Sequence, residues 1–136
     1  MPQKKPRPSS LRGVTTKQIT GHGNLYITIT YKVSRKPFET FIVLGKAGSC
    51  EQAWIEALAR AISIGFRFGV PPGEYIRQLR GIQCGDPIPD PNRQGFIRSP
   101  ADAIALVLRD FIEGKPFGAG LDQVTKGPDR STLPTE

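Results

Sequence analysis

The sequence predicts a single α+β domain, in which a small antiparallel β-meander precedes three helices. Apolar and polar residues alternate between Leu25 and Val33, which is typical of a strand with one buried face. Apolar residues then recur at helical spacing in two segments, about 51–68 and 100–112, and a serine suited to capping precedes each segment. Because the strands come first and the helices afterwards, the pattern favours α+β over an alternating α/β fold.

The first predicted elements are strands. The strand 25–33 places Leu25, Ile27 and Ile29 on one face. A polar connection at 34–37 leads to a second strand at 38–44, and a shorter strand is expected at about 17–20. We expect helices to cover one face of this sheet.

The first predicted helix runs from about Glu51 to Phe68. Ser49 is a suitable N-cap, and Gln52 completes a capping-box pattern. A broad apolar face predicts that this helix is well buried. The face comprises Trp54, Ile55, Leu58, Ala61, Ile62, Ile64 and Phe66.

Two more helices are predicted further along the chain. One begins at Pro71-Pro72 and ends at about Arg80. The other is capped by Ser99, begins at Pro100 and ends before Gly114. The proline-rich segment 86–92 is expected to contain no regular element.

The net charge of +7 is concentrated near the N-terminus, because residues 1–18 carry five basic side chains and no acidic one. We expect a basic disordered arm at 1–18, the folded domain at 19–114 and a flexible polar tail at 115–136, with Phe117 as a docking point. Such an arm can contact phosphates, although solubility alone explains many basic tails. The arginines of the folded domain, Arg93 among them, are interpreted as a solvated face.

Composition also indicates the cellular compartment in which the protein is expected. Two cysteines do not make a disulfide framework, which favours a reducing environment. The sequence shows neither the apolar core of a secretory signal nor an apolar stretch of membrane-spanning length. We therefore expect a cytoplasmic protein without membrane contact.

Three residues have the chemistry of metal ligands, and each lies at the end of a predicted element. They are His22, the only histidine, and Cys50 and Cys84, the only cysteines. An imidazole and two thiolates predict a zinc site that joins a strand end to two helix ends, but a closed tetrahedral site needs a fourth ligand. Three alternatives remain: buried cysteines acting as small hydrophobes, a Cys50–Cys84 disulfide, and an open metal site of a small hydrolase.

The loop 45–50 has the composition of an anion site. It runs from a strand into a helix N-terminus, and Lys46, Gly48 and Ser49 are the candidate ligand-binding residues. The spacing is not that of a Walker A motif. The alternative interpretation is that the glycines form a turn and that Ser49 only caps the helix.

Five short motifs follow one another along the predicted domain. They are Thr20-Gly21-His22-Gly23-Asn24-Leu25-Tyr26, Pro37-Phe38-Glu39-Thr40-Phe41-Ile42, Leu44-Gly45-Lys46-Ala47-Gly48-Ser49-Cys50, Gly69-Val70-Pro71-Pro72 and Gln78-Leu79-Arg80-Gly81-Ile82-Gln83-Cys84. Together these motifs resemble the TSCPD domain family, which occurs at the C-terminal end of adenosylcobalamin-dependent ribonucleotide reductases and as small free-standing proteins. The similarity runs from about Ile19 to Phe111.

Two departures from the family pattern affect the metal site that this resemblance implies. His22 stands where the family has its first cysteine, which preserves a possible ligand. In Ser99-Pro100-Ala101-Asp102 the serine and aspartate of the final motif remain, but its cysteine is absent. Asp86 and Asp102 are possible oxygen ligands, and each is also explained without metal, by a turn and by a helix first turn respectively.

The resemblance implies a link to ribonucleotide reductase and deoxynucleotide metabolism. The sequence given is far too short to contain the reductase barrel. We therefore expect a non-catalytic accessory or binding module, with a degenerate zinc site, that docks on a larger protein or on a second copy. The alternative is a nucleotide- or nucleic-acid-binding protein that uses the Gly45–Ser49 loop and the basic arm.

Overall fold

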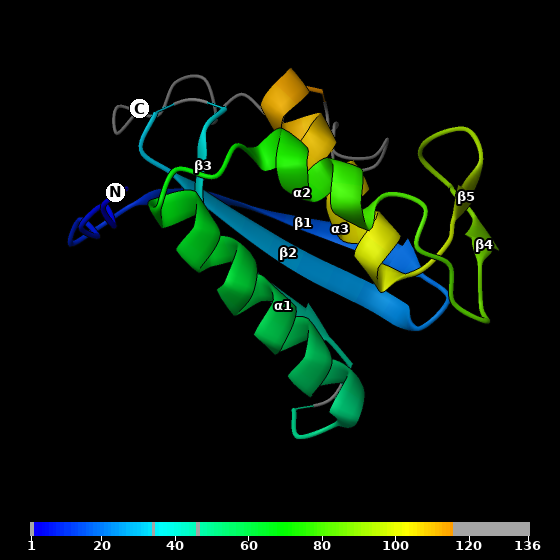
Figure 1. Cartoon of the computed structure of the whole chain (residues 1–136). Helices are drawn as coiled ribbons and strands as arrows, with labels where there is room; N and C mark the ends of the chain where they lie inside the picture. Colours follow the sequence, from blue (N-terminus) through cyan, green and yellow to red (C-terminus); the bar gives the residue numbers. More distant parts are fainter. Residues whose placement is uncertain (1, 34, 46, 116–136) are drawn as a thin grey trace, which may run out of the picture.

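A computed structural model describes residues 2–33, 35–45 and 47–115 (Figure 1). Strands β1 (Arg12–Thr20), β2 (Gly23–Tyr31) and β3 (Pro37–Leu44) form an antiparallel sheet in the order β1-β2-β3. Helices α1 (Cys50–Arg67), α2 (Pro72–Leu79) and α3 (Pro100–Glu113) come later in the chain. The predicted α+β fold, a meander followed by helices, is confirmed.

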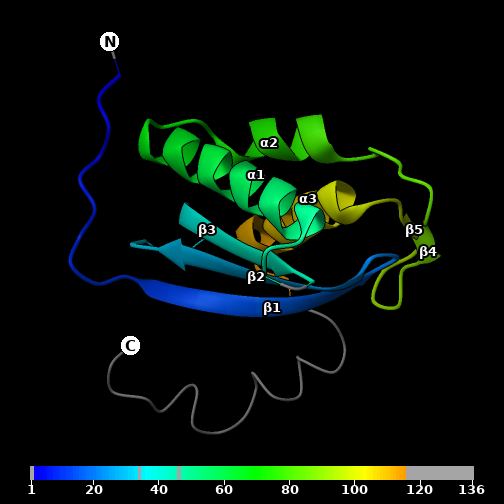
Figure 2. The ribbon, with the colours of Figure 1, turned by 90° about the horizontal axis from the view of Figure 1, so that it is seen from below.

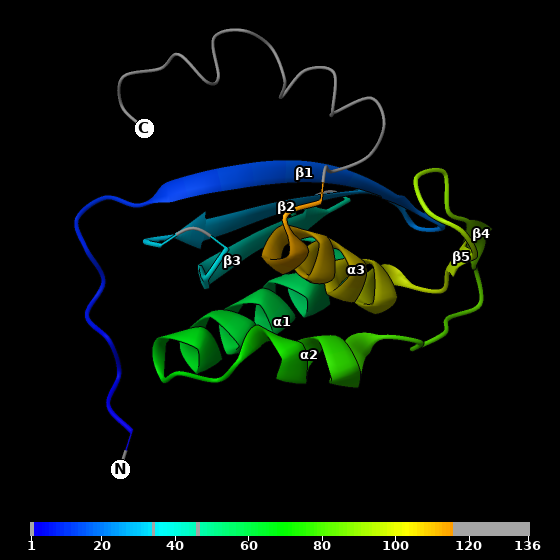
Figure 3. The same cartoon turned by 90° about the horizontal axis from the view of Figure 1, so that it is seen from above.

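All three helices lie on the same face of the sheet (Figures 2 and 3). Helix α1 packs along β3, while α3 lies against β1 and β2 and also contacts α2. The core forms where the sheet meets α1 and α3, because the period-two residues of β2 and the period-3.6 residues of both helices point there. Its fully buried members include Leu25, Ile27, Ile29, Leu44, Ile62, Ile104 and Leu108.

Strand β1 is longer than the sequence predicts, and it takes up part of the segment expected to be a disordered arm. It pairs with β2 along its whole length, from Arg12 opposite Tyr31 to Thr20 opposite Gly23. Its buried side chains are the polar Thr16, Gln18 and Thr20. The strand therefore lacks the apolar alternation that marks β2. Because its segment is also basic, most of it was assigned to the disordered arm.

Helix α1 is less buried than its composition predicts. Its core face consists of Ile55, Ala59, Ile62 and Phe66. Trp54, expected in the core, is 76% exposed, and Ile64 and Phe68 are also exposed. The prediction was wrong because α1 is apolar on two sides, and helical periodicity does not show which side meets the sheet.

The segment 86–92, expected to contain no regular element, includes the first strand of a short hairpin. Strand β4 (Ile88–Pro89) pairs with β5 (Phe96–Ile97). None of the helices in the described ranges is long and apolar enough to cross a membrane. The predicted tail lies outside the described residues from position 116 onward, and Phe117 lies there too.

Candidate functional site

The turn between β1 and β2 places His22 against the loop that follows α2. Thr20 holds the turn, because its hydroxyl donates to Gly23 O at 2.8 Å and accepts from His22 N at 3.0 Å. The turn packs so closely that a Cβ on Gly21 would lie 1.8 Å from the carbonyl oxygen of Asp86. Only glycine fits at this position without displacing the backbone of the loop.

His22 joins three separate parts of the chain. Its Nδ1 lies 2.6 Å from a carboxylate oxygen of Glu51 in the first turn of α1. Its Nε2 lies 3.5 Å from the sulfur of Cys84 and 3.6 Å from a carboxylate oxygen of Asp86. Two hydrogen bonds raise the pKa of His22 above its usual value. The bond with Cys84 has the larger effect, and the bond with Glu51 has the next largest.

Two of the three predicted metal ligands are therefore brought together, and the third is not seen with them. Cys50 is the exposed first residue of α1, and its neighbour Glu51 is the residue that contacts His22. Both cysteines are free thiols. Across the described ranges, no group of three or more His, Cys, Asp or Glu side chains is arranged to hold a metal ion.

These residues do not fit a closed zinc site, which needs four ligands around one point. Nδ1 of His22 is paired with Glu51, and its Nε2 faces the sulfur of Cys84, which also accepts a hydrogen bond from Asp86 N at 3.3 Å. Within the described residues, these two donors are not joined by the further ligands that a closed site requires. The cluster holds the β1–β2 turn, α1 and the loop together through hydrogen bonds. The described residues therefore do not form the zinc site that the sequence predicts, and metal analysis of the purified protein is the test of zinc binding.

Asp102, the other possible oxygen ligand, is 3% exposed and has a structural role. Its carboxylate accepts hydrogen bonds from Gly81 N at 2.8 Å and Arg98 N at 3.0 Å. Its own backbone N–H donates to Ser99 Oγ at 3.1 Å, which confirms Ser99 as the cap of α3. Asp102 thus fastens the start of α3 to the end of α2.

The predicted anion loop is only partly described, because Lys46 lies outside the described residues. Gly45 and Gly48 have φ angles of 72° and 86°, as expected for turn glycines. Ser49 caps α1 by accepting from Gln52 N at 3.1 Å. The carboxylate of Glu51 lies in the first turn, so it competes with an external anion for the positive end of the helix dipole.

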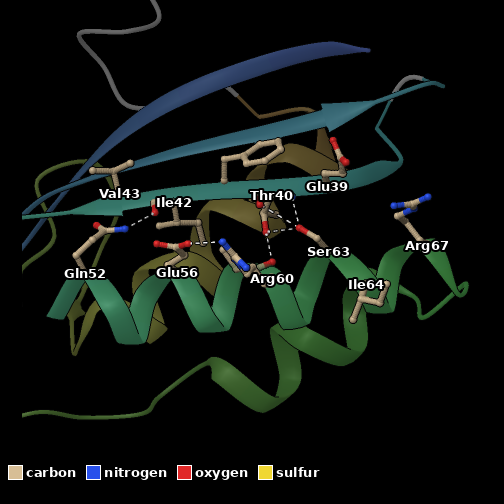
Figure 4. Close-up of a pocket in the computed structure, with 12 residues that line it drawn as sticks. Glu39, Thr40, Ile42, Val43, Gln52, Glu56, Arg60, Ser63, Ile64 and Arg67 are labelled. Atoms are coloured by element: carbon tan, nitrogen blue, oxygen red, sulfur yellow. Dashed lines mark hydrogen bonds and ion pairs between the residues drawn. The ribbon is translucent and has the colours of Figure 1, made fainter. Parts of the chain in front are cut away.

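Sequence reasoning missed how α1 closes the free edge of β3, which borders a groove of about 400 Å³ (Figure 4). The amide of Gln52 accepts from Leu44 N at 2.6 Å and donates to Ile42 O at 3.3 Å. Ser63 Oγ accepts from Thr40 N at 2.9 Å and donates to Thr40 O at 3.0 Å. These side chains satisfy backbone groups that a further strand would otherwise bind.

A second missed feature is a buried polar network around Arg93. Its guanidinium donates to Asp110 at 2.9 Å, to Asp90 at 3.1 Å and to Gln18 at 3.0 Å. The interpretation of Arg93 as a solvated residue was wrong, since the network ties the β4–β5 hairpin to β1 and α3. Gln18 is 75 residues and Asp110 is 17 residues from Arg93 in the sequence, so no local pattern could reveal this network.

A third missed feature is an apolar stripe on the outer side of α1. The name outer stripe is used for five residues, Trp54, Ala57, Ala61, Ile64 and Phe68. Their spacing of three, four, three and four residues places them in one row on a helix, opposite the core face. All five are exposed. The alternating spacing was visible in the sequence, but it was assigned to the core.

Comparisons with known proteins place the chain in a family. The TSCPD domain model matches residues 2–112. A vitamin B12-dependent ribonucleotide reductase of Bradyrhizobium diazoefficiens is 29% identical over 145 residues. That alignment covers 100% of this chain and 12% of the reductase, so the chain spans a small part of its relative. No solved structure matches. Since the family model covers most of the chain, the chain belongs to the TSCPD domain family.

Proposed function

We propose that this chain is a non-catalytic accessory domain that docks on a larger protein of ribonucleotide reduction through the outer stripe of α1. The observation that carries the proposal is the exposure of this stripe. Large apolar side chains exposed in a continuous row are typical of protein–protein contact sites. Helices that are apolar on both sides are usually buried on both sides.

The shape of the stripe suits a protein partner. Trp54 lies at one end, Ile64 and Phe68 lie at the other, and Ala57 and Ala61 form a low centre between them. An apolar ridge from a partner, such as a helix, fits between the large side chains because the alanines allow close approach. Aromatic residues at such positions commonly contribute most of the binding free energy.

The polar clusters support a structural rather than a catalytic role. Both ring nitrogens of His22 have partners within the fold, and Asp102 accepts two backbone hydrogen bonds. These groups connect segments of the domain. Their contacts within the fold support a role in stability.

The choice of partner rests on the relative. In the vitamin B12-dependent reductase, the matching region makes up 12% of a much longer chain. A region similar to this chain is therefore covalently joined to a much longer protein in that relative. We propose that the outer stripe contacts a surface of such a reductase.

The test is calorimetric titration of purified vitamin B12-dependent ribonucleotide reductase with this chain. We expect Trp54→Ser to weaken binding by about 30-fold, which corresponds to an anchor worth about 2 kcal/mol. Phe41→Ser is the matched control, since it removes another exposed aromatic ring, from β3. Absence of binding by the wild type, or equal affinity of wild type and Trp54→Ser, contradicts the proposal.

A further inference from the structure

A small basic pocket lies at the end of the molecule where the N-terminal segment meets the β2–β3 connection. It has a volume of about 170 Å³ and is lined by Lys5, Lys32, Val33, Lys36, Pro37 and Phe38. We call it the lysine pocket. Three of its six lining residues are lysines, and none is acidic. The lysines come from two segments that are distant in sequence, so only the fold brings them together.

The backbone holds Lys5 in place at this pocket. Lys5 N donates to the Arg67 carbonyl at 2.8 Å, and the Arg67 guanidinium donates back to Lys5 O at 3.0 and 2.9 Å. Arg7 adds an ion pair of 2.7 Å with the nearly buried carboxylate of Glu39. These contacts do not use the side chain of Lys5, which leaves its ammonium group for the pocket.

The pocket is also lined by Phe38, whose ring is approached by two cations. Lys32 Nζ is 5.4 Å from the ring centre, and the guanidinium carbon of Arg67 is 5.7 Å from it. Cation–π attraction keeps both charges near the pocket. The ring itself is 5% exposed, so it offers no stacking surface to a base.

The charge of the pocket is not balanced within the described part of the chain. None of Lys5, Lys32 and Lys36 makes an ion pair there, and the nearby Glu39 already pairs with Arg7. Bringing like charges together costs free energy that a bound anion recovers. The arrangement therefore favours a ligand with several negative charges.

We propose that the lysine pocket binds the phosphate backbone of a nucleic-acid strand. Lysines act as point charges without directional geometry, which suits sequence-independent contact with successive phosphates. A mononucleotide is a poorer match, because the lining residues provide neither a stacking face nor a set of side-chain hydrogen bonds for a base. The role differs from protein docking by the outer stripe and uses another part of the surface.

The experiment measures binding of a fluorescein-labelled single-stranded oligonucleotide by anisotropy at several salt concentrations. We expect Lys32→Glu and Lys36→Glu each to reduce the slope of log affinity against log salt by about 0.7, the value for one phosphate contact of a single strand. At 0.1 M salt this corresponds to about fivefold weaker binding for each variant. Both side chains are exposed, so we expect both variants to fold.

Lys17→Glu is the control, because it makes the same charge change at an exposed position of β1 away from the pocket. If the three variants weaken binding equally, net charge alone explains the effect and the proposal is overturned. It is also overturned if inorganic phosphate or a nucleoside triphosphate competes as well as unlabelled oligonucleotide, or if anionic phospholipid vesicles bind and the oligonucleotide does not. Trp54→Ser should leave oligonucleotide binding unchanged. Nucleic-acid binding by the lysine pocket is thereby tested independently of protein docking by the outer stripe.

Discussion

Single residues in the β1–β2 turn decide how closely this turn approaches α1 and the loop that follows α2. Gly21 has no side chain, and this absence lets the turn touch the backbone of Asp86. His22 then reaches both Glu51 and Cys84. His22 is thus the centre of a hydrogen-bonded cluster.

Substitution of Gly21 tests the importance of this close approach. In Gly21→Ala the new methyl group would lie 1.8 Å from a carbonyl oxygen, so the loop must move. We expect the free energy of unfolding to fall by about 1–3 kcal/mol, as for other overpacked sites. Gly85→Ala in the same loop is the control, since nothing lies within 4 Å of its Cβ position, and it should change stability by less than about 0.5 kcal/mol. Urea denaturation measures both, and equal stabilities would show that the turn is not tightly packed.

The same residues lead to a prediction about zinc. His22 and Cys84 meet, but the described residues do not complete a four-ligand site. For protein purified under reducing conditions without chelator, we expect elemental analysis to give well under one zinc per chain. We also expect that EDTA leaves the melting temperature unchanged. About one zinc per chain, lost in Cys84→Ala, would instead mean that a further ligand closes the site.

At the scale of elements, side chains of α1 bind the free backbone groups of β3, which a fourth strand would bind in a larger sheet. Gln52 matches the position expected of a capping box, yet its side chain bonds to β3 and only its N–H takes part in capping by Ser49. Ser63 makes the second such connection. The helix thereby protects an edge strand from pairing with other chains.

Removal of both connections should expose this edge. In the double variant Gln52→Ala, Ser63→Ala, backbone groups of β3 lose their partners, and we expect a loss of about 2–4 kcal/mol in the free energy of unfolding. The freed edge should also increase self-association, seen as light scattering that rises with protein concentration. Arg60→Ala is the control on the same helix, because Arg60 is exposed and forms a surface ion pair with Glu56. A double variant as stable and monomeric as this control would contradict the role of α1 at the edge.

Periodicity was enough to predict β2, β3, α1 and α3, because each has an apolar face that its own sequence displays. It did not reveal the length of β1, whose buried side chains include Thr16 and Gln18. These polar residues are stabilised by the rest of the fold, as when Gln18 accepts a hydrogen bond from Arg93. The meeting of His22 with Cys84 was expected from the family motifs, but the contact with Glu51 depends on how α1 lies on the sheet. Long-range contacts of this kind have no local signal.

For the molecule as a whole, the fold presents two surfaces with different chemistry. The outer stripe of α1 is apolar, while the lysine pocket lies where the N-terminal segment and the β2–β3 connection meet. The positive charge that the sequence concentrates near its N-terminus is therefore partly anchored to the domain, through Lys5 and Arg7. A partner protein and a nucleic acid would not compete for the same side chains.

The single tryptophan of the chain gives a direct measure of the free state of the outer stripe. Trp54 is 76% exposed, so we expect the isolated protein to show the long-wavelength emission of an indole in water and efficient quenching by acrylamide. We also expect the spectrum to stay constant on dilution, because a larger protein, and not a second copy, is the proposed occupant. A short-wavelength emission that moves to longer wavelength on dilution would mean that two copies bury Trp54 against each other. Sedimentation equilibrium over the same concentrations checks the association state independently, and Trp54→Ser should abolish any dimer that forms through this face.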